Sequence, residues 1–185
     1  MSQMSRDDVL NKIKAGESLA GLDLTEIDLS YETLKGVDFT NANLENARLQ
    51  NSNLEGANLS GANLNKAFIF GSNLHNAILD NASCEETNLQ DTNLEKASMK
   101  NANFYHTALL GSNLDNADLT GSNLTRARLK RASMRGTILD NANMQNAHLV
   151  RSNLTNASLK NANLENATLT NAITDGANFD GASGI

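Results

Sequence analysis

Residues 42–66 read ANLEN ARLQN SNLEG ANLSG ANLNK, five consecutive groups of five residues, and this pattern organises almost the whole chain. Each group has Leu at its centre and Ala or Ser two positions earlier. The spacing continues from Leu24 to Phe179 without an insertion or deletion, and in that span only Cys84 and Thr174 replace Leu, Ile, Met or Phe at the centre. A repeat this regular in a chain of 185 residues predicts a single solenoid domain.

A five-residue period fits neither a regular helix nor a flat strand. On an α-helix each step of five turns the central residue by roughly 140°, so the leucines would spiral around the axis. On a flat strand an odd spacing sends successive leucines to opposite faces. We therefore expect one bend per group, placed just after the centre, because the second residue after the centre is mostly Asn or Gly. These two residues adopt positive φ at low cost.

The residue just before each centre indicates how many groups complete one coil. Asn recurs there in two series with a period of twenty, while the two intervening series are mixed. This alternation predicts four groups per coil, and identical residues on successive coils predict hydrogen-bonded Asn ladders. The first series contains Asn43, Asn63, Asn103, Asn123, Asn143 and Asn163, and the second contains Asn53, Asn73, Asn93, Asn113 and Asn153.

The groups at 42–46, 57–61 and 162–166 resemble the A(D/N)LXX pattern of pentapeptide repeat proteins. The resemblance covers roughly residues 22–183. It implies an all-β solenoid, a right-handed quadrilateral parallel β-helix of about eight coils, in which the central residue and the small residue two before it pack inside. The expected core column on one side contains Leu44, Leu64, Cys84, Phe104, Leu124, Met144 and Leu164.

The two ends of the chain differ. Residues 1–16 predict an N-terminal capping helix, with Ser5 as N-cap, an apolar face of Val9, Leu10 and Ile13, and Gly16 as the stop. The repeat domain then occupies residues 17–185. No comparable helix follows Phe179, so either the last residues fold over the core or the sheet edge pairs with that of a second rod. Several family members dimerise through their C-terminal ends, so the resemblance implies a homodimer there.

Composition argues against catalysis and against a membrane. The sequence contains no signal peptide or transmembrane stretch, so we expect a cytoplasmic protein without membrane contact. Cys84 occupies a central position and is expected to be a small core residue. His75, His106 and His148 are scattered outward positions without ligand-spaced partners, and no phosphate loop or nucleophile arrangement is present. We predict no catalytic, cofactor or metal site and no enzyme activity.

One side of the predicted rod differs from the others in charge. The outward residues around Leu29, Leu49, Ile69 and each twentieth residue onward form this basic side, whereas the chain as a whole has a net charge of −6. Apolar residues at outward positions here predict one apolar strip beside the cations. A stiff surface that tolerates stray apolar residues is the alternative explanation. The candidate partner surface contains Phe68, Phe70, Ala108, Leu110, Arg128, Lys130, Arg131, Val150 and Arg151.

The leading functional hypothesis is a non-catalytic interaction rod that presents side chains to a protein partner. The cationic group is too small, on an acidic chain, to predict direct nucleic-acid binding. The alternative comes from the resemblance: some pentapeptide repeat proteins mimic duplex DNA, bind DNA gyrase or topoisomerase IV and protect it from quinolones or toxins. That alternative would depend on the acidic residues Glu45, Asp80, Glu85, Glu86, Asp118 and Asp140.

Overall fold

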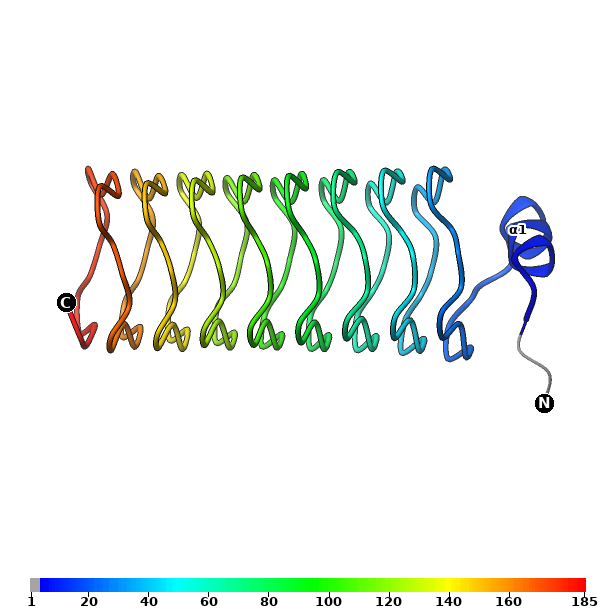
Figure 1. Ribbon diagram of the computed structural model, residues 1–185, viewed down its shortest axis with the longest axis horizontal. Coiled ribbons are helices and arrows are strands. Elements are labelled where there is room, and N and C mark those ends of the chain that lie inside the picture. Colours follow the sequence, from blue (N-terminus) through cyan, green and yellow to red (C-terminus); the bar gives the residue numbers. More distant parts are fainter. Residues whose placement is uncertain (1–3) are drawn as a thin grey trace.

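The computed structural model describes residues 4–185 and is a rod of stacked coils (Figure 1). The coils follow one another in sequence order along the rod, with α1 at one end and the C-terminus at the other. Parallel bridges join residues twenty apart, from Asp23↔Asn43 at the start to Asn163↔Ser183 at the end. The bridges are isolated and do not form longer strands. Since each group has five residues, this pairing makes four groups per coil, as the Asn series predicts.

The single helix in the described residues, α1, spans Arg6–Lys14. Ser5 is its N-cap: the Ser5 hydroxyl accepts a hydrogen bond from the Asp8 N–H at 3.2 Å, and the Asp8 carboxylate accepts one from the Ser5 N–H at 3.3 Å. Val9 is fully buried and belongs to the same apolar core as the first coils. The helix therefore covers the first sheet edge with an apolar face. Residues 1–3 of the predicted cap lie outside the described residues.

The bends fall where the sequence predicts them. The second residue after every centre, from Glu26 to Gly181, has a positive φ between 51° and 72°. After each bend the centre's backbone N–H donates to the next coil, as when Leu44 N donates to the Asn63 carbonyl at 2.7 Å. The predicted location of the bends is thus confirmed, although ten of these positions hold residues other than Asn or Gly.

The interior of the rod is a filled apolar column. Every central side chain from Leu24 to Leu164 is at most 1% exposed, and Cys84 is among them. Burial of each Leu contributes about 1.5–3 kcal/mol relative to the exposed side chain. Where Thr replaces Ala at the small position, its hydroxyl is also satisfied: Thr107 Oγ1 donates to the Cys84 carbonyl of the preceding coil at 2.6 Å. Leu169 and Phe179 of the final coil are only partly buried.

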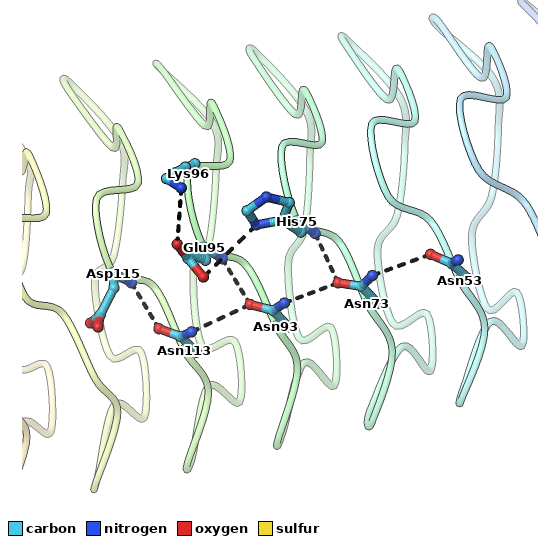
Figure 2. A network of polar contacts seen from close by, with 8 residues as sticks. All are labelled: Asn53, Asn73, His75, Asn93, Glu95, Lys96, Asn113 and Asp115. Atoms are coloured by element: carbon cyan, nitrogen blue, oxygen red, sulfur yellow. Dashed lines mark hydrogen bonds and ion pairs between the residues drawn. The ribbon is translucent and has the colours of Figure 1, made fainter.

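The predicted Asn ladders form along part of each series. In Figure 2 the Nδ2 of Asn73 donates to Oδ1 of Asn53 at 3.3 Å, and Asn93 donates to Asn73 in the same way at 3.0 Å. The same Asn73 oxygen accepts the backbone N–H of His75 at 3.2 Å. Asn73 and Asn93 each link their coil to the preceding one, and the oxygen of each also caps the turn that follows it.

Candidate partner-binding surface

Outward residues on the basic side form columns that run along the rod. The bridges Ala108↔Arg128 and Arg128↔His148 place residues twenty apart next to each other on neighbouring coils. The backbone N–H of Arg131 donates to the Val150 carbonyl at 3.1 Å in the same register. Four such columns make up this surface, and each consists of residues twenty apart in the sequence. They pass through positions 126, 128, 130 and 131. Neighbouring members of a column are separated by about 4.8 Å.

Five cations gather on two consecutive coils of these columns, and we call them the basic cluster. All five side chains belong to exposed residues. Within residues 4–185 none of them lies within 4.0 Å of a carboxylate, although Lys35, Lys96 and Lys100 elsewhere on the rod form ion pairs. Mutually repelling charges without counter-charges cost stability. The basic cluster consists of Arg126, Arg128, Lys130, Arg131 and Arg151.

Acidic residues are missing from the four columns on both sides of the basic cluster along the rod. From His106 to Asn171 the four columns contain no Asp or Glu. The nearest acids in the columns are Glu86 and Asp91, each two coils from a cluster residue. The acid-free region covers four coils, or about 14 Å from the first to the last. A confined positive field therefore lies on a chain whose net charge is −6.

A hollow of about 240 Å³ opens in this region. Arg126 and Arg128 both line this hollow. In the sequence Arg126 belongs to the preceding side, but it occupies the corner between that side and the basic side. The sequence analysis therefore missed Arg126. Its position two residues before Arg128, directly across the bend, could have indicated that the two side chains lie close together. The Arg126 guanidinium also donates to the Tyr105 hydroxyl at 3.3 Å. The lining residues are His106, Arg126, Arg128, Asn146, His148 and Asn166.

The predicted single apolar strip was wrong. Asn88 lies between Phe68 and Ala108 in their column, and Ala108 is buried at 3% exposure. In the neighbouring column Gln90 separates Phe70 from Leu110. Residues forty apart skip one coil, so a shared side does not make them neighbours. The candidate apolar residues consequently fall into separate groups.

Those candidate apolar residues that remain accessible to solvent lie at two places on the basic side. Phe68 and Phe70 are 44% and 38% exposed and, with Arg48 and Gln50, line a hollow of about 230 Å³. The Gln50 Oε1 atom is buried there without a hydrogen-bond partner among the described residues. Farther along, the half-buried Leu110 and Val150 lie on either side of Lys130 in one column. The structure thus joins the cations to Leu110 and Val150 and leaves the Phe68–Phe70 pair apart.

Backbone conformation also distinguishes the basic side. Of the ten positive-φ positions that hold neither Asn nor Gly, nine lie on the two corners that border this side, and only Lys96 lies elsewhere. Positive φ costs an ordinary residue about 1–2 kcal/mol. Such departures from local preference concentrate where function requires a particular side chain. The nine residues are Glu26, Tyr31, Lys66, Glu86, Asp91, His106, Arg126, Arg131 and Arg151.

Two kinds of feature were not found in the described residues. No group of three or more His, Cys, Asp or Glu side chains within residues 4–185 is arranged to hold a metal ion. The described part of the chain also has no helix long and apolar enough to cross a membrane. What the geometry offers is a rigid surface with fixed charges.

The bridged coils and their exposed charged side define a solenoid protein. The chain belongs to the pentapeptide repeat family, because the family model for pentapeptide repeats matches eight overlapping segments between residues 18 and 183. A comparison with curated proteins gives no match.

Solved structures of other family members resemble the chain. HetL from the cyanobacterium Nostoc, which is involved in heterocyst differentiation regulation, is 30% identical over 97% of both chains, with a TM-score of 0.35. QnrB1, a plasmid-mediated fluoroquinolone resistance protein, is 18% identical over 84% of this chain and 92% of its own, with a TM-score of 0.47. A pentapeptide repeat protein from the cyanobacterium Cyanothece is 22% identical over 96% and 98%, with a TM-score of 0.25. All three TM-scores lie below 0.5, so membership rests on the repeat pattern.

Proposed function

We propose that this chain is a non-catalytic interaction rod, a right-handed β-helix of about eight coils that binds a macromolecular partner through its basic side. The observation that carries the proposal is the basic cluster: five exposed cations on two coils with no carboxylate within ion-pairing distance among residues 4–185. Such a cluster destabilises the free rod and stabilises a complex with complementary charge. Family membership agrees with this role, because repeat solenoids use extended surfaces for binding.

The stiffness of the rod supports the same role. Its interior is filled by side chains that are almost completely buried, so the hollows on the basic side are shallow features of the surface. Each coil is fixed to its neighbours by backbone hydrogen bonds of 2.6–3.1 Å. The backbone positions that carry the arginines therefore keep a constant spacing, which lowers the backbone entropy lost on binding.

The alternative function, a mimic of duplex DNA that binds gyrase, is less well supported than binding through the basic side. It requires free carboxylates on the acidic sides of the rod. Oδ1 of Asp80 accepts hydrogen bonds from the Ser98 hydroxyl at 2.6 Å and from the Lys100 N–H at 2.9 Å. Asp140 makes the equivalent bonds to the next coil. These carboxylates serve as acceptors within the rod. Inhibition of gyrase supercoiling by the purified protein at micromolar concentration would favour the alternative over the basic side.

Site-specific photo-crosslinking tests the proposed function. A photoreactive amino acid replaces either Lys130, inside the basic cluster, or Lys160, an exposed lysine on another side, and both variants are irradiated in the producing cells. We expect one discrete adduct from position 130 and none from position 160. Equal labelling from both positions, or no adduct from position 130, would contradict the proposal.

A further inference from the structure

The chemistry of the partner follows from the shape and surroundings of the basic cluster. Arg126, Arg128, Lys130 and Arg131 lie on one coil and therefore form a row across the rod, and Arg151 extends this row to the next coil. A ligand that neutralises all five charges must carry several negative charges within a small area. This requirement excludes an apolar or cationic partner at this place.

The length of the acid-free region limits the size of the anion. Its four coils span about 14 Å, which an extended polypeptide covers with about four to six residues at 3.3 Å each. Beyond it, Glu86 and Asp91 occupy the same columns and would repel a continuing polyanion. Farther toward the N-terminal end the same columns hold Lys66 and Arg48 as well as Glu26 and Asp28, so the charges there are mixed. A short anionic segment fits the surface, and a long uniform polyanion does not.

The neighbouring sides argue against a nucleic-acid duplex. A duplex is wider than one side of the rod and would also approach Asp115 and Asp175 on one adjacent side and Glu165 on the other. Nucleic-acid surfaces gain affinity by neutralising many consecutive phosphates, which an isolated group of five cations cannot do. The net charge of −6 adds to this repulsion.

Apolar surface within the region indicates a polypeptide. Leu110 and Val150 are half-buried and lie directly before and after Lys130 in one column. An extended acidic peptide whose carboxylates and apolar side chains lie on the same face can place carboxylates on the cations and apolar side chains on Leu110 and Val150. Phosphate-based polyanions have no groups that use such contacts.

We propose that the basic cluster binds a short acidic polypeptide segment, about six residues long, that presents both carboxylates and apolar side chains to the rod. This inference rests on the proposed function and specifies its partner. Arg126 and Arg128 hold carboxylates at the mouth of the hollow, while Lys130, Arg131 and Arg151 hold those of the rest of the segment. Leu110 and Val150 contact its apolar residues.

Fluorescence anisotropy tests the proposal with a fluorescein-labelled peptide, about six residues long, in which glutamate and leucine both occur on the same face of the extended chain. We expect saturable binding that weakens with salt and is lost when lysine replaces glutamate in the peptide. The double variant Arg128→Glu/Arg131→Glu should bind at least about tenfold more weakly, because each reversal replaces an attraction by a repulsion. Lys130→Glu/Arg151→Glu is a second pair, in case the first variant does not fold.

Arg135→Glu is the matched control, because Arg135 is an exposed cation of the same coil on the adjacent side. It should leave peptide affinity within about twofold of wild type. Equal loss in this control, no saturable binding of the peptide, or tighter binding of a single-stranded oligonucleotide of equal charge would overturn the proposal. If crosslinking from position 130 still succeeds in that case, the interaction rod stands and only the partner chemistry is wrong.

Discussion

Ser133 donates a hydrogen bond from Oγ to Oδ1 of Asp115 on the preceding coil at 2.6 Å. The backbone N–H of Arg135 donates to the same Asp115 oxygen at 2.9 Å. One coil earlier Asn113 provides this acceptor itself, since its Oδ1 accepts the Asp115 N–H at 3.0 Å. Asp115 therefore replaces the turn acceptor that is lost where Ser interrupts the Asn column.

The same arrangement occurs at Ser83, which interrupts the other Asn column, and at Ser98 and Ser158 in a mixed column. Each of these three Ser residues is accompanied by Asn or Asp eighteen residues earlier, whose side-chain oxygen accepts both the hydroxyl and the turn N–H. Because the two positions lie on different coils, the sequence does not reveal their relation until the twenty-residue register is known. The other pairs are Ser83 with Asn65, Ser98 with Asp80, and Ser158 with Asp140.

We predict that Asp115→Ala lowers the free energy of unfolding by about 1 kcal/mol, because the Ser133 hydroxyl and the Arg135 N–H lose their acceptor. Ser133→Asn should restore most of this loss in the Asp115→Ala background, since an Asn side chain at that position caps its own turn. Urea denaturation of the four proteins in this double-mutant cycle measures the coupling. Strictly additive effects would show that the two sites act independently.

Leu114 tests the inward column. It is fully buried, so Leu114→Ala should lower the free energy of unfolding by about 2–5 kcal/mol through lost transfer energy and a residual cavity. Leu114→Lys should abolish soluble expression, because it buries an unpaired charge. Leu110→Lys, at an outward position of the same coil, is the control and should express normally. Normal expression and melting of Leu114→Lys would contradict the inward assignment.

Cys84 should be chemically inert in the native rod. Burial raises the pKa of its thiol far above the ordinary value, so the reactive thiolate is scarce at neutral pH. We expect no reaction with a thiol reagent at pH 8 under native conditions and one reacting thiol per chain in denaturant, measured by absorbance. Rapid reaction of the folded protein at a rate independent of denaturant would place Cys84 at the surface.

Stability should decline at acid pH because turn carboxylates are ionised in the folded state. A hydrogen bond from the Ser18 hydroxyl, with further bonds from Thr40, lowers the pKa of Asp38 from its ordinary 3.8. The pKa of Asp28 is lowered mainly by the Ser30 hydroxyl and backbone. Because the folded pKa lies below the unfolded one, the stabilisation is present above the ordinary value and is lost as pH falls through the folded value.

Denaturation measured between about pH 7 and pH 2 checks this window. The free energy of unfolding should be nearly constant down to about pH 5 and decrease below about pH 4. Asp38→Asn should show a smaller decrease than wild type across the acid range, since it removes one of the linked groups. A decline centred near pH 6 would implicate other groups.

Arg131 should show a conflict between stability and binding. Its φ of 59° is unfavourable for Arg and well tolerated by Asn, so Arg131→Asn should raise the free energy of unfolding by about 0.5–1 kcal/mol. The same substitution should weaken binding of the acidic peptide, because it removes one cation of the basic cluster. Thermal melting and anisotropy on one preparation measure both effects. Arg151→Asn, at a position with φ 58°, should behave in the same way.

Much of the fold was predictable from local sequence. The five-residue spacing specified which side chains point inward, the residues two after each centre specified where the chain bends, and the two Asn series specified four groups per coil. Ser5 specified the start of α1. These features succeed because each group repeats the same local choice, and every coil repeats its neighbour's contacts.

The surface depended on tertiary structure. Arg126 joined Arg128 in one hollow only because the bend between them brings a corner residue beside the next side. Phe68 and Ala108 were separated because column neighbours are twenty residues apart and not forty. The sequence by itself determined the inward column and the period of the coil, since those follow from residues close together in the chain. The tertiary structure decided which outward residues meet, because stacking creates neighbours that no five-residue group contains.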